Sequence, residues 1–293
     1  GAVAKIFEAK GRPQDNPLIL HIADRAGYTR IVRSLPPKAQ QLIERFCPGP
    51  LTLVLPKTEL VPDAVTAGLD SVAVRMPSSA IARQLIRLAG VPIAAPSANI
   101  SGRPSPTCAR DVIEDLQGKV AAIVAADTVE IGLESTVVDC TVEPPKLLRP
   151  GGITVSMIEN TIGKIQIDPS IDTYVQVSTP KSPGMKYKHY APQAPMYVWE
   201  GLSDKQLLAE INLLAGQNVG VLLRASLAEQ LVNKPREMIV WQDLKDLAKN
   251  LFSALREFDR REVKTIYAQG VETTGLGLAI MNRMRKSAGF KII

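Results

Sequence analysis

Cysteine, histidine and aromatic residues are all scarce in this sequence. Three of its 293 residues are cysteines, two are histidines, and aromatic side chains make up 4%. Cys47, Cys108 and Cys140 are odd in number and form no Cys-x-x-Cys pair, which argues against a disulfide framework or zinc site and favours a reducing compartment. Two histidines exclude a histidine-rich metal site. So few aromatic side chains disfavour a protein that stacks nucleic-acid bases on aromatic platforms.

Long apolar runs are missing as well. No uninterrupted apolar stretch approaches the roughly 20 residues that span a bilayer, and no signal peptide is recognisable, so we expect a cytoplasmic protein. Hydrophobic residues make up 45% and charged residues 22%, as in globular rather than disordered chains. The net charge of +6 suits a polyanionic ligand such as a nucleotide or RNA, although many ordinary enzymes carry a similar excess.

The first ten residues have the pattern of the middle of an amphipathic helix. Val3, Ile6 and Phe7 fall on one face of it. Neither an initiator Met nor a strand precedes this helix, so we expect that an N-terminal segment is missing.

Three regions follow from the alternation of apolar and polar stretches. Residues 1–165 predict a mixed α/β domain with a twisted sheet and helices on its faces, with strands at 17–22, 51–55, 71–75, 91–95, 120–125, 136–139 and 146–148 and helices at 39–46 and 80–89. Residues 166–194 contain many Pro, Ser, Thr, Tyr and Lys residues and predict an extended linker. Residues 195–293 predict a small Rossmann-like parallel sheet, with strands at 196–199, 219–223, 238–241 and 263–267 and helices starting after Ser203 and at 227–232, 244–258 and 276–287.

A basic turn follows the first helix. Lys10 and Arg12 flank Gly11 just before a proline-rich stretch. Two cations beside a tight turn suit phosphate or carboxylate oxygens, and glycine lets the backbone approach a ligand. A lysine that complements the helix dipole, next to a solvated arginine, explains this turn equally simply.

Two further loops carry polar groups at the ends of strands. Residues 96–105 read Pro-Ser-Ala-Asn-Ile-Ser-Gly-Arg-Pro-Ser after a strand of small apolar residues, which suits either a ligand crevice or a polar turn that caps the next helix. Residues 132–136 and 148–152 contribute Glu134, Ser135 and Arg149 beside glycines, which suits either an anion site or a surface turn. No Gly-x-x-x-x-Gly-Lys-[Ser/Thr] motif is present, and Gly275-Leu276-Gly277 lacks the third glycine of a dinucleotide fingerprint.

Together these loops resemble the threonylcarbamoyl-AMP synthase family, which has a YrdC-type domain and, in its longer members, a C-terminal extension domain. The family signature Lys-x-Arg followed far downstream by Ser-x-Asn is found as Lys10-Gly11-Arg12 and Ser97-Ala98-Asn99. Segments similar to the family's sequence also occur at 16–21, 48–52, 72–77, 134–139 and 149–151, and in the linker at 182–192. The resemblance covers essentially the whole chain.

The resemblance implies an enzyme that makes threonylcarbamoyl-AMP and pyrophosphate. L-threonine and bicarbonate would form a carbamate that attacks the α-phosphate of ATP, with Mg²⁺ as an expected companion of ATP. A partner transferase would then pass the threonylcarbamoyl group to an adenosine of tRNA. The implied catalytic residues are Lys10 and Arg12; the implied ATP-binding residues are Arg12, Asn16, Ser71, Ser97, Asn99, Ser105 and Arg149; the implied threonine-binding residues are His21, Arg75, Ala95 and Ser135; and the implied linker gate is Lys186, Tyr187 and His189. No protein ligand for a metal is implied.

The sequence departs from the family pattern at three points. A first strand with a Pro-Thr-[Asp/Glu]-Thr-x-Tyr-Gly-Leu motif is absent, Ser71 stands where Thr is common, and Ser79 stands where His is common. Two other functions fit parts of the sequence. A non-catalytic RNA-binding module would explain the basic balance, and a carbamoyl transferase of hydrogenase maturation shares the YrdC-type domain but needs further domains that this chain lacks.

Overall fold

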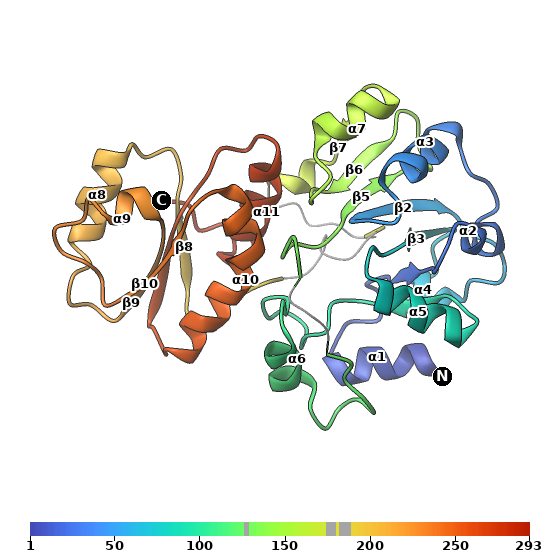
Figure 1. The fold of residues 1–293 in the computed structure, drawn as a ribbon, viewed down its shortest axis with the longest axis horizontal. Coiled ribbons are helices and arrows are strands. Elements are labelled where there is room, and N and C mark those ends of the chain that lie inside the picture. Colours follow the sequence, from blue (N-terminus) through green and yellow to red (C-terminus); the bar gives the residue numbers. More distant parts are fainter. Residues whose placement is uncertain (126–128, 174–179, 182–188) are drawn as a thin grey trace. The chain divides into compact units, whose positions relative to one another are not determined.

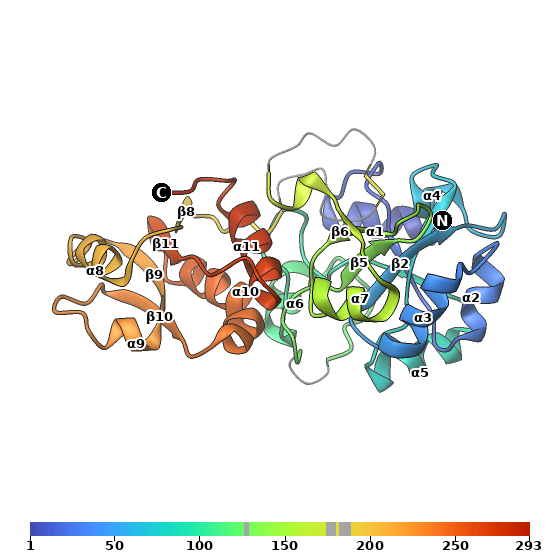
Figure 2. The same cartoon turned by 90° about the horizontal axis from the view of Figure 1, so that it is seen from above.

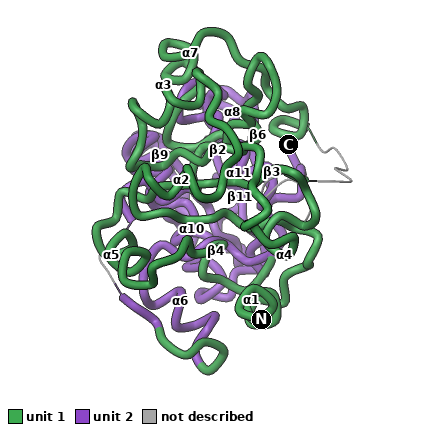
Figure 3. Tube along the Cα trace, turned by 90° about the vertical axis from the view of Figure 1, so that its right-hand side faces the viewer, with its two compact units in different colours: residues 1–101, 118–122, 134–187 green, residues 102–117, 123–133, 188–293 purple. Residues whose placement is uncertain are grey.

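The computed structural model describes residues 1–125, 129–173, 180–181 and 189–293 (Figure 1). The chain divides into two compact units (Figure 3). Unit 1 comprises residues 1–101, 118–122 and 134–187, and unit 2 comprises residues 102–117, 123–133 and 188–293. Each unit contains its own sheet and is described separately.

Unit 1 is built on a mixed seven-stranded sheet of order β4-β1-β3-β2-β5-β6-β7. Its strands are β1 (Ile19–His21), β2 (Leu51–Pro56), β3 (Ser71–Arg75), β4 (Ile93–Ala95), β5 (Thr136–Asp139), β6 (Lys146–Arg149) and β7 (Gln166–Ile167). Strand β3 pairs parallel to β1 and antiparallel to β2, and β2 pairs parallel to β5. The central strand β2 is apolar and almost wholly buried, as expected for a strand covered on both faces.

The helices of unit 1 bury one stripe each. They are α1 (Ala2–Lys10), α2 (Ala26–Ile31), α3 (Pro37–Phe46), α4 (Asp63–Thr66), α5 (Ala80–Ala89) and α7 (Val155–Ile162), with a 3₁₀ turn at Pro169–Ile171. Helices α3 and α7 pack side by side (Figure 2). Helix α3 starts with Pro37 at its first turn and buries Ala39, Leu42 and Ile43, which is the spacing of an amphipathic helix.

Unit 2 is a three-layer sandwich around a parallel four-stranded sheet of order β10-β9-β11-β8. Its strands are β8 (Met196–Trp199), β9 (Val219–Arg224), β10 (Glu237–Trp241) and β11 (Thr265–Gln269), and its helices are α6 (Ala109–Leu116), α8 (Asp204–Asn212), α9 (Ala225–Ala228), α10 (Leu244–Arg260) and α11 (Leu276–Ser287). One core lies between the sheet and helices α10 and α11, and the other lies between the sheet and helices α8 and α9 (Figure 1). The adjacent residues Leu222 and Leu223 of β9 enter opposite cores. The strand therefore has the period of two expected for a sheet covered on both faces.

The sequence predicted most of these elements but not all. The mixed α/β sheet and the parallel Rossmann-like sheet are confirmed, as is the helix that starts after Ser203, where Ser203 and Gln206 form a capping box at the start of α8. The strand predicted at 120–125 is wrong, because these residues form bends and irregular structure; the run lacks a partner strand in the sheet order. The helix predicted at 227–232 is the short α9, which starts at Ala225 and ends at Ala228. The region predicted as a linker also contributes β7 to the edge of the sheet.

The two compact units cut the chain differently from the predicted boundaries at 165 and 195. Helix α6 and the described residues 123–125 and 129–133 pack with the C-terminal region in unit 2. The reason is ionic: Arg256 and Arg260 of α10 pair with the acidic side of α6. Among the described residues, no helix combines the length and the apolar character that a membrane span requires.

Helix α10 should be the main stabilising helix of unit 2. Leu251 lies on its buried face and has no solvent-exposed area, whereas Leu213 is 73% exposed. We expect Leu251→Ala to lower the free energy of unfolding by about 2–5 kcal/mol, because a buried cavity is left behind, and Leu213→Ala to change it by less than about 0.5 kcal/mol. Urea unfolding of both variants measures the difference. Equal effects of the two substitutions would contradict this packing.

Candidate active site

The basic turn and the Ser/Asn turn meet in unit 1. Lys10 Nζ donates to the carbonyl oxygens of Ser97 (2.6 Å) and Asn99, and lies 3.5 Å from Asn99 Oδ1. The backbone supports the same contact, because Ser101 N donates to Lys10 O at 2.9 Å. The two motifs lie close to ninety residues apart in sequence and share one buried hydrogen-bonded cluster.

The end of α1 aims Lys10 at this cluster. Gly11 ends the helix in the left-handed conformation (φ 59°), where glycine carries no steric penalty. Arg12 N then donates back to Phe7 O at 2.9 Å. Lys10 is the last helical residue, and the chain turns sharply away after it. The lysine is 5% exposed.

Arg12 and Asn16 form a second buried group just beyond this turn. Arg12 Nη2 donates to the carbonyl oxygens of Asn16 (3.4 Å) and Pro17 (3.1 Å). Asn16 is 1% exposed, and neither its Nδ2 nor its Oδ1 has a hydrogen-bond partner in the described part of the chain. An unsatisfied buried amide costs free energy, so a ligand with both a donor and an acceptor is the natural partner of this side chain.

A polar row crosses the sheet at one end. His21 of β1 is paired with Arg75 of β3, which is paired with Thr52 of β2. Thr52 is paired with Val137 of β5, and Val137 is paired with Arg149 of β6. Residues in register point to the same face. The row therefore brings two arginines, a histidine and a threonine to one edge of one sheet face.

Ser135 connects the far end of this row. Arg149 donates from Nε to Ser135 O at 3.0 Å and from Nη2 to Ser135 Oγ at 3.1 Å. The hydroxyls of Ser135 and Thr52 lie 2.7 Å apart. Thr52 was not among the residues predicted from the sequence. The signal that could have found it is a lone hydroxyl inside the apolar run Leu51–Leu55. Thr52 lies in the segment 48–52 that is similar to the family, but the resemblance gave it no role.

Burial sets the charges of the row. Desolvation, followed by the nearby positive charge of Arg149, lowers the pKa of Arg75 to about 10, which still leaves it protonated near neutrality. Desolvation, followed by the charge of Arg75, lowers the pKa of His21 to about 4, so His21 is neutral there. Arg75 Nε donates to Gly49 O at 3.1 Å. The two neighbouring cations, Arg75 and Arg149, favour the binding of an anion beside them.

Apolar side chains separate the row from the lysine cluster. Ile19, Ala73 and Ala95 are in register across β1, β3 and β4 and lie on the face that carries the polar row. Ser71 lies two residues before Ala73 and therefore shares this face. Strand β4 ends at Ala95, two residues before Ser97. A ligand on this face would thus reach the lysine cluster at one end of β1 and the arginine row at the other.

The remaining predicted residues lie elsewhere. Ser105 and His189 belong to unit 2, and Lys186 and Tyr187 lie outside the described residues. The described residues contain no group of three His, Cys, Asp or Glu side chains arranged to hold a metal ion. A basic pocket adjoins Lys10 and is lined also by Lys5, Gly11, Gly118 and Lys119.

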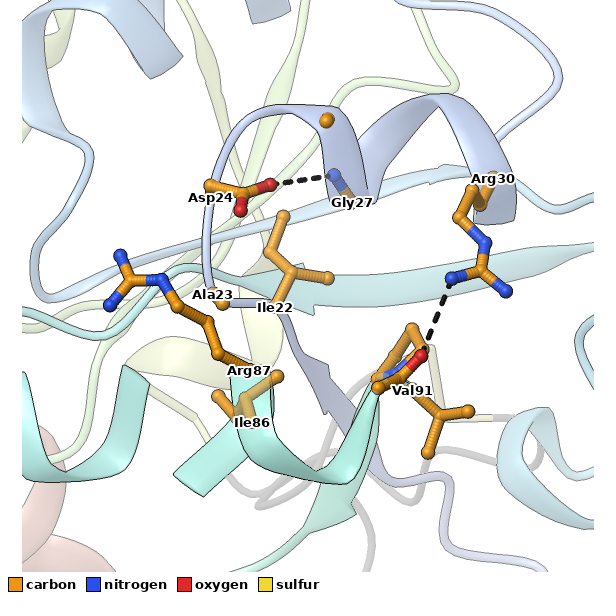
Figure 4. Close-up of a pocket in the computed structure, with 11 residues that line it drawn as sticks. Ile22, Ala23, Asp24, Gly27, Arg30, Ile86, Arg87 and Val91 are labelled. Atoms are coloured by element: carbon orange, nitrogen blue, oxygen red, sulfur yellow. Dashed lines mark hydrogen bonds between the residues drawn. The ribbon is translucent and has the colours of Figure 1, made fainter. Parts of the chain in front are cut away.

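A second pocket of unit 1 lies between the end of β1, α2 and α5 (Figure 4). Its polar groups bind the backbone around them: Asp24 Oδ1 accepts from Gly27 N at 3.3 Å, and Arg30 Nη1 donates to Gly90 O at 3.5 Å. Apolar groups such as Ile22 and Ile86 complete the lining (Figure 4). We assign no chemistry to this pocket, because its polar groups serve to fix the start of α2 and the end of α5.

Comparisons with known proteins agree along the whole chain. Residues 1–151 match the sequence family described as "Telomere recombination", and residues 153–289 match the family described as "Threonylcarbamoyl-AMP synthase, C-terminal domain". The threonylcarbamoyl-AMP synthase of Pyrococcus abyssi is 50% identical over 297 residues, which cover 100% of this chain and 86% of that protein. The threonylcarbamoyl-AMP synthase of Bacillus subtilis is 48% identical over 295 residues, which cover 100% of this chain and 85% of that protein. The crystal structure of P. abyssi Sua5 complexed with L-threonine matches with a TM-score of 0.94 and 50% identity, over 100% of this chain and 86% of that chain.

The lowered pKa of His21 should make stability depend on pH. Between about 4 and 6.5, an unfolded histidine takes up a proton that folded His21 does not. The free energy of unfolding should therefore fall as pH falls through this window, by at most about 1.4 kcal/mol per pH unit from this group. His21→Gln should remove this component, and urea unfolding of both proteins between pH 4 and 7 measures it. Curves that stay parallel across the window would contradict the neutral, buried histidine.

Proposed function

The chain belongs to the threonylcarbamoyl-AMP synthase family, and we infer that it makes threonylcarbamoyl-AMP and pyrophosphate from L-threonine, bicarbonate and ATP. The family match covers the whole chain, including the segments that carry both signature motifs. The observation that carries the inference within the structure is the hydrogen bonding of Lys10 to Ser97 and Asn99. It joins the two signatures on a sheet face that also bears a pair of arginines.

Threonine is assigned to the polar row. A guanidinium presents a planar fork that matches a carboxylate, so Arg75 is the proposed partner of the threonine carboxylate. Ser135 and the backbone at Ala95 would hold the rest of the amino acid. Neutral His21 can accept or donate a hydrogen bond without adding a third positive charge to the row. The relative from P. abyssi was crystallised with L-threonine, which supports an amino-acid site in this fold.

ATP is assigned to the lysine end of the same face. Lys10 and Arg12 supply positive charge, and Asn16, Ser71, Ser97 and Asn99 supply hydroxyl and amide groups for the nucleotide. Asn16 has an unsatisfied donor and acceptor in a buried position, as a group that binds a polar ligand should. The assignments of Arg149 and Ser105 to ATP belong to the same proposal. Arg149 touches Ser135, so it would act where the two substrates meet.

The reaction needs alignment and charge stabilisation more than a nucleophilic side chain. The threonine amine attacks bicarbonate and water leaves, which gives the carbamate. A carbamate oxygen then attacks the α-phosphorus of ATP; the new O–P bond forms while the bond to the β-phosphate oxygen breaks, and pyrophosphate leaves with the electron pair. Holding both substrates on one face makes this step effectively intramolecular. Lys10 and Arg12 would stabilise the charge that develops on the phosphate oxygens.

Three features of the proposal reach beyond these residues. Mg²⁺ would arrive with ATP and be held by phosphate oxygens and water, because Mg²⁺ commonly binds through substrate phosphates rather than protein cages. The product is a reactive mixed anhydride, so a transferase that delivers it to tRNA must follow. A cytoplasmic location fits this use of ATP and tRNA.

The reaction should be measurable as pyrophosphate release. We expect the purified protein to release pyrophosphate from ATP only when L-threonine and bicarbonate are both present. Omitting either substrate, or replacing L-threonine with D-threonine, should leave only background. Pyrophosphate release that ignores threonine would reject the proposed function.

Lys10 should matter far more than its neighbour on the same helix. Lys10→Ala removes the buried ammonium that joins the two motifs, and we expect turnover to fall by on the order of 10²-fold. Lys5→Ala is the matched control, because Lys5 is exposed on the same helix and should retain turnover within about two-fold. Steady-state rates measured with saturating threonine and bicarbonate compare the two. Equal losses would indicate a general effect on α1.

A further inference from the structure

Helix α10 of unit 2 binds the two chain segments that adjoin motifs of the proposed site. One segment is 102–107, which follows Ser97–Asn99 and contains Ser105; the other is 131–133, which precedes Glu134 and Ser135. We propose that α10 is a positioning element for both substrates of the synthase reaction, with Arg256 as its principal positioning residue. This inference rests on the proposed function.

Arg256 fixes the backbone immediately before Ser105. Its Nε and Nη2 donate to Pro104 O at 3.1 and 2.7 Å. Its Nη1 and Nη2 also donate to the two carboxylate oxygens of Asp115, at 3.3 and 2.8 Å. Arg256 is 5% exposed and Asp115 is 1% exposed. One guanidinium therefore locks the turn at Pro104 and the end of α6 together, using a planar fork that lysine cannot reproduce.

Other side chains of α10 extend the same contact. Ser253 lies one turn before Arg256, and its hydroxyl is 2.6 Å from that of Thr107. Arg260 lies one turn after it and pairs with Asp111 and Glu114 of α6. These positions recur every three or four residues, so they lie on one face of the helix. This face of α10 contacts the segment that follows the Ser/Asn motif in sequence.

The second segment meets the backbone of the same helix. A Cβ atom added to Gly132 would lie 2.2 Å from Lys249 O and 2.5 Å from Ala248 O. Gly132 thus approaches α10 more closely than any other residue type allows. The next residue, Leu133, is buried in the core that contains α10. Ser135, which binds Arg149 and Thr52, follows two residues later.

The two contacts should affect the binding of different substrates. Moving Pro104 moves Ser105, a proposed ATP contact, while moving Gly132 moves Ser135, a proposed threonine contact. Neither Arg256 nor Gly132 is proposed to touch a substrate. Disturbing them should therefore raise KM values selectively, because misplacement of a positioning segment weakens binding or alignment.

The first test compares two arginine-to-lysine changes on α10. Arg256→Lys keeps a cation beside Asp115 but loses the fork on Pro104 O. We expect KM for ATP to rise on the order of 10-fold with KM for threonine within about two-fold of the parent. Arg260→Lys is the matched control, since Arg260 pairs with Asp111 and Glu114 of α6 and with Glu257 of its own helix, and both KM values should stay within about two-fold.

The second test compares two glycine-to-alanine changes at positions with nearly the same positive φ. Gly132 has φ 75° and Gly216 has φ 78°, but nothing lies within 4 Å of a Cβ at Gly216. Gly216→Ala therefore reports the conformational strain alone. We expect Gly132→Ala to raise KM for threonine on the order of 10-fold, and Gly216→Ala to leave it within about two-fold.

Thermal unfolding of all four variants accompanies the kinetics. A lower melting temperature with unchanged KM values for Arg256→Lys and Gly132→Ala would mean that α10 contributes stability only, and would overturn the inference. A rise in both KM values for either variant would overturn it too, because the two segments would not act separately. A parent protein without threonine-dependent pyrophosphate release would instead reject the proposed function, so the two failures are distinguishable.

Discussion

The Lys10 ammonium group is the contact on which the proposed site depends. It donates to carbonyl oxygens on residues 87 and 89 positions away in sequence and is buried in doing so. A buried cation is costly unless its hydrogen-bonding capacity is used, so this lysine holds the Ser/Asn turn in one conformation. Removing it would leave the carbonyl groups of Ser97 and Asn99 without their donor. In the proposed site the same group would supply positive charge to the phosphate oxygens of ATP.

The arginine row has the opposite electrostatic character. Burial disfavours the charge of Arg75, and the nearby positive charge of Arg149 disfavours it further. Two guanidinium groups in a partly desolvated row attract an anion. Neutral His21 limits the accumulated charge. An amino-acid carboxylate is therefore a better match for the row than a neutral ligand.

The sequence singled out residues that lie together in the candidate site more reliably than it predicted the elements around them. Lys10, Ser97 and Asn99 stood out because polar residues interrupted apolar patterns at strand and helix ends, and the structure brings them together. Thr52 was missed because its role arises from register: it comes to lie between Arg75 and Ser135 only when β2 is paired on both sides. The strand expected at 120–125 was wrong for a related reason. An apolar run has strand character only where a neighbouring strand can pair with it, and pairing is not visible in local sequence.

The assignment of α6 to unit 2 shows the same limit at the level of domains. Its sequence position between β4 and β5 suggested that it belongs to the first sheet, yet Asp111 and Asp115 are buried against arginines from the far end of the chain. Buried carboxylates need such partners, so these two residues fix where α6 can pack. The C-terminal unit thus has a physical task that its lack of catalytic motifs did not suggest. It supplies the cations that compensate the buried carboxylates of a helix inserted between two motifs of the chain.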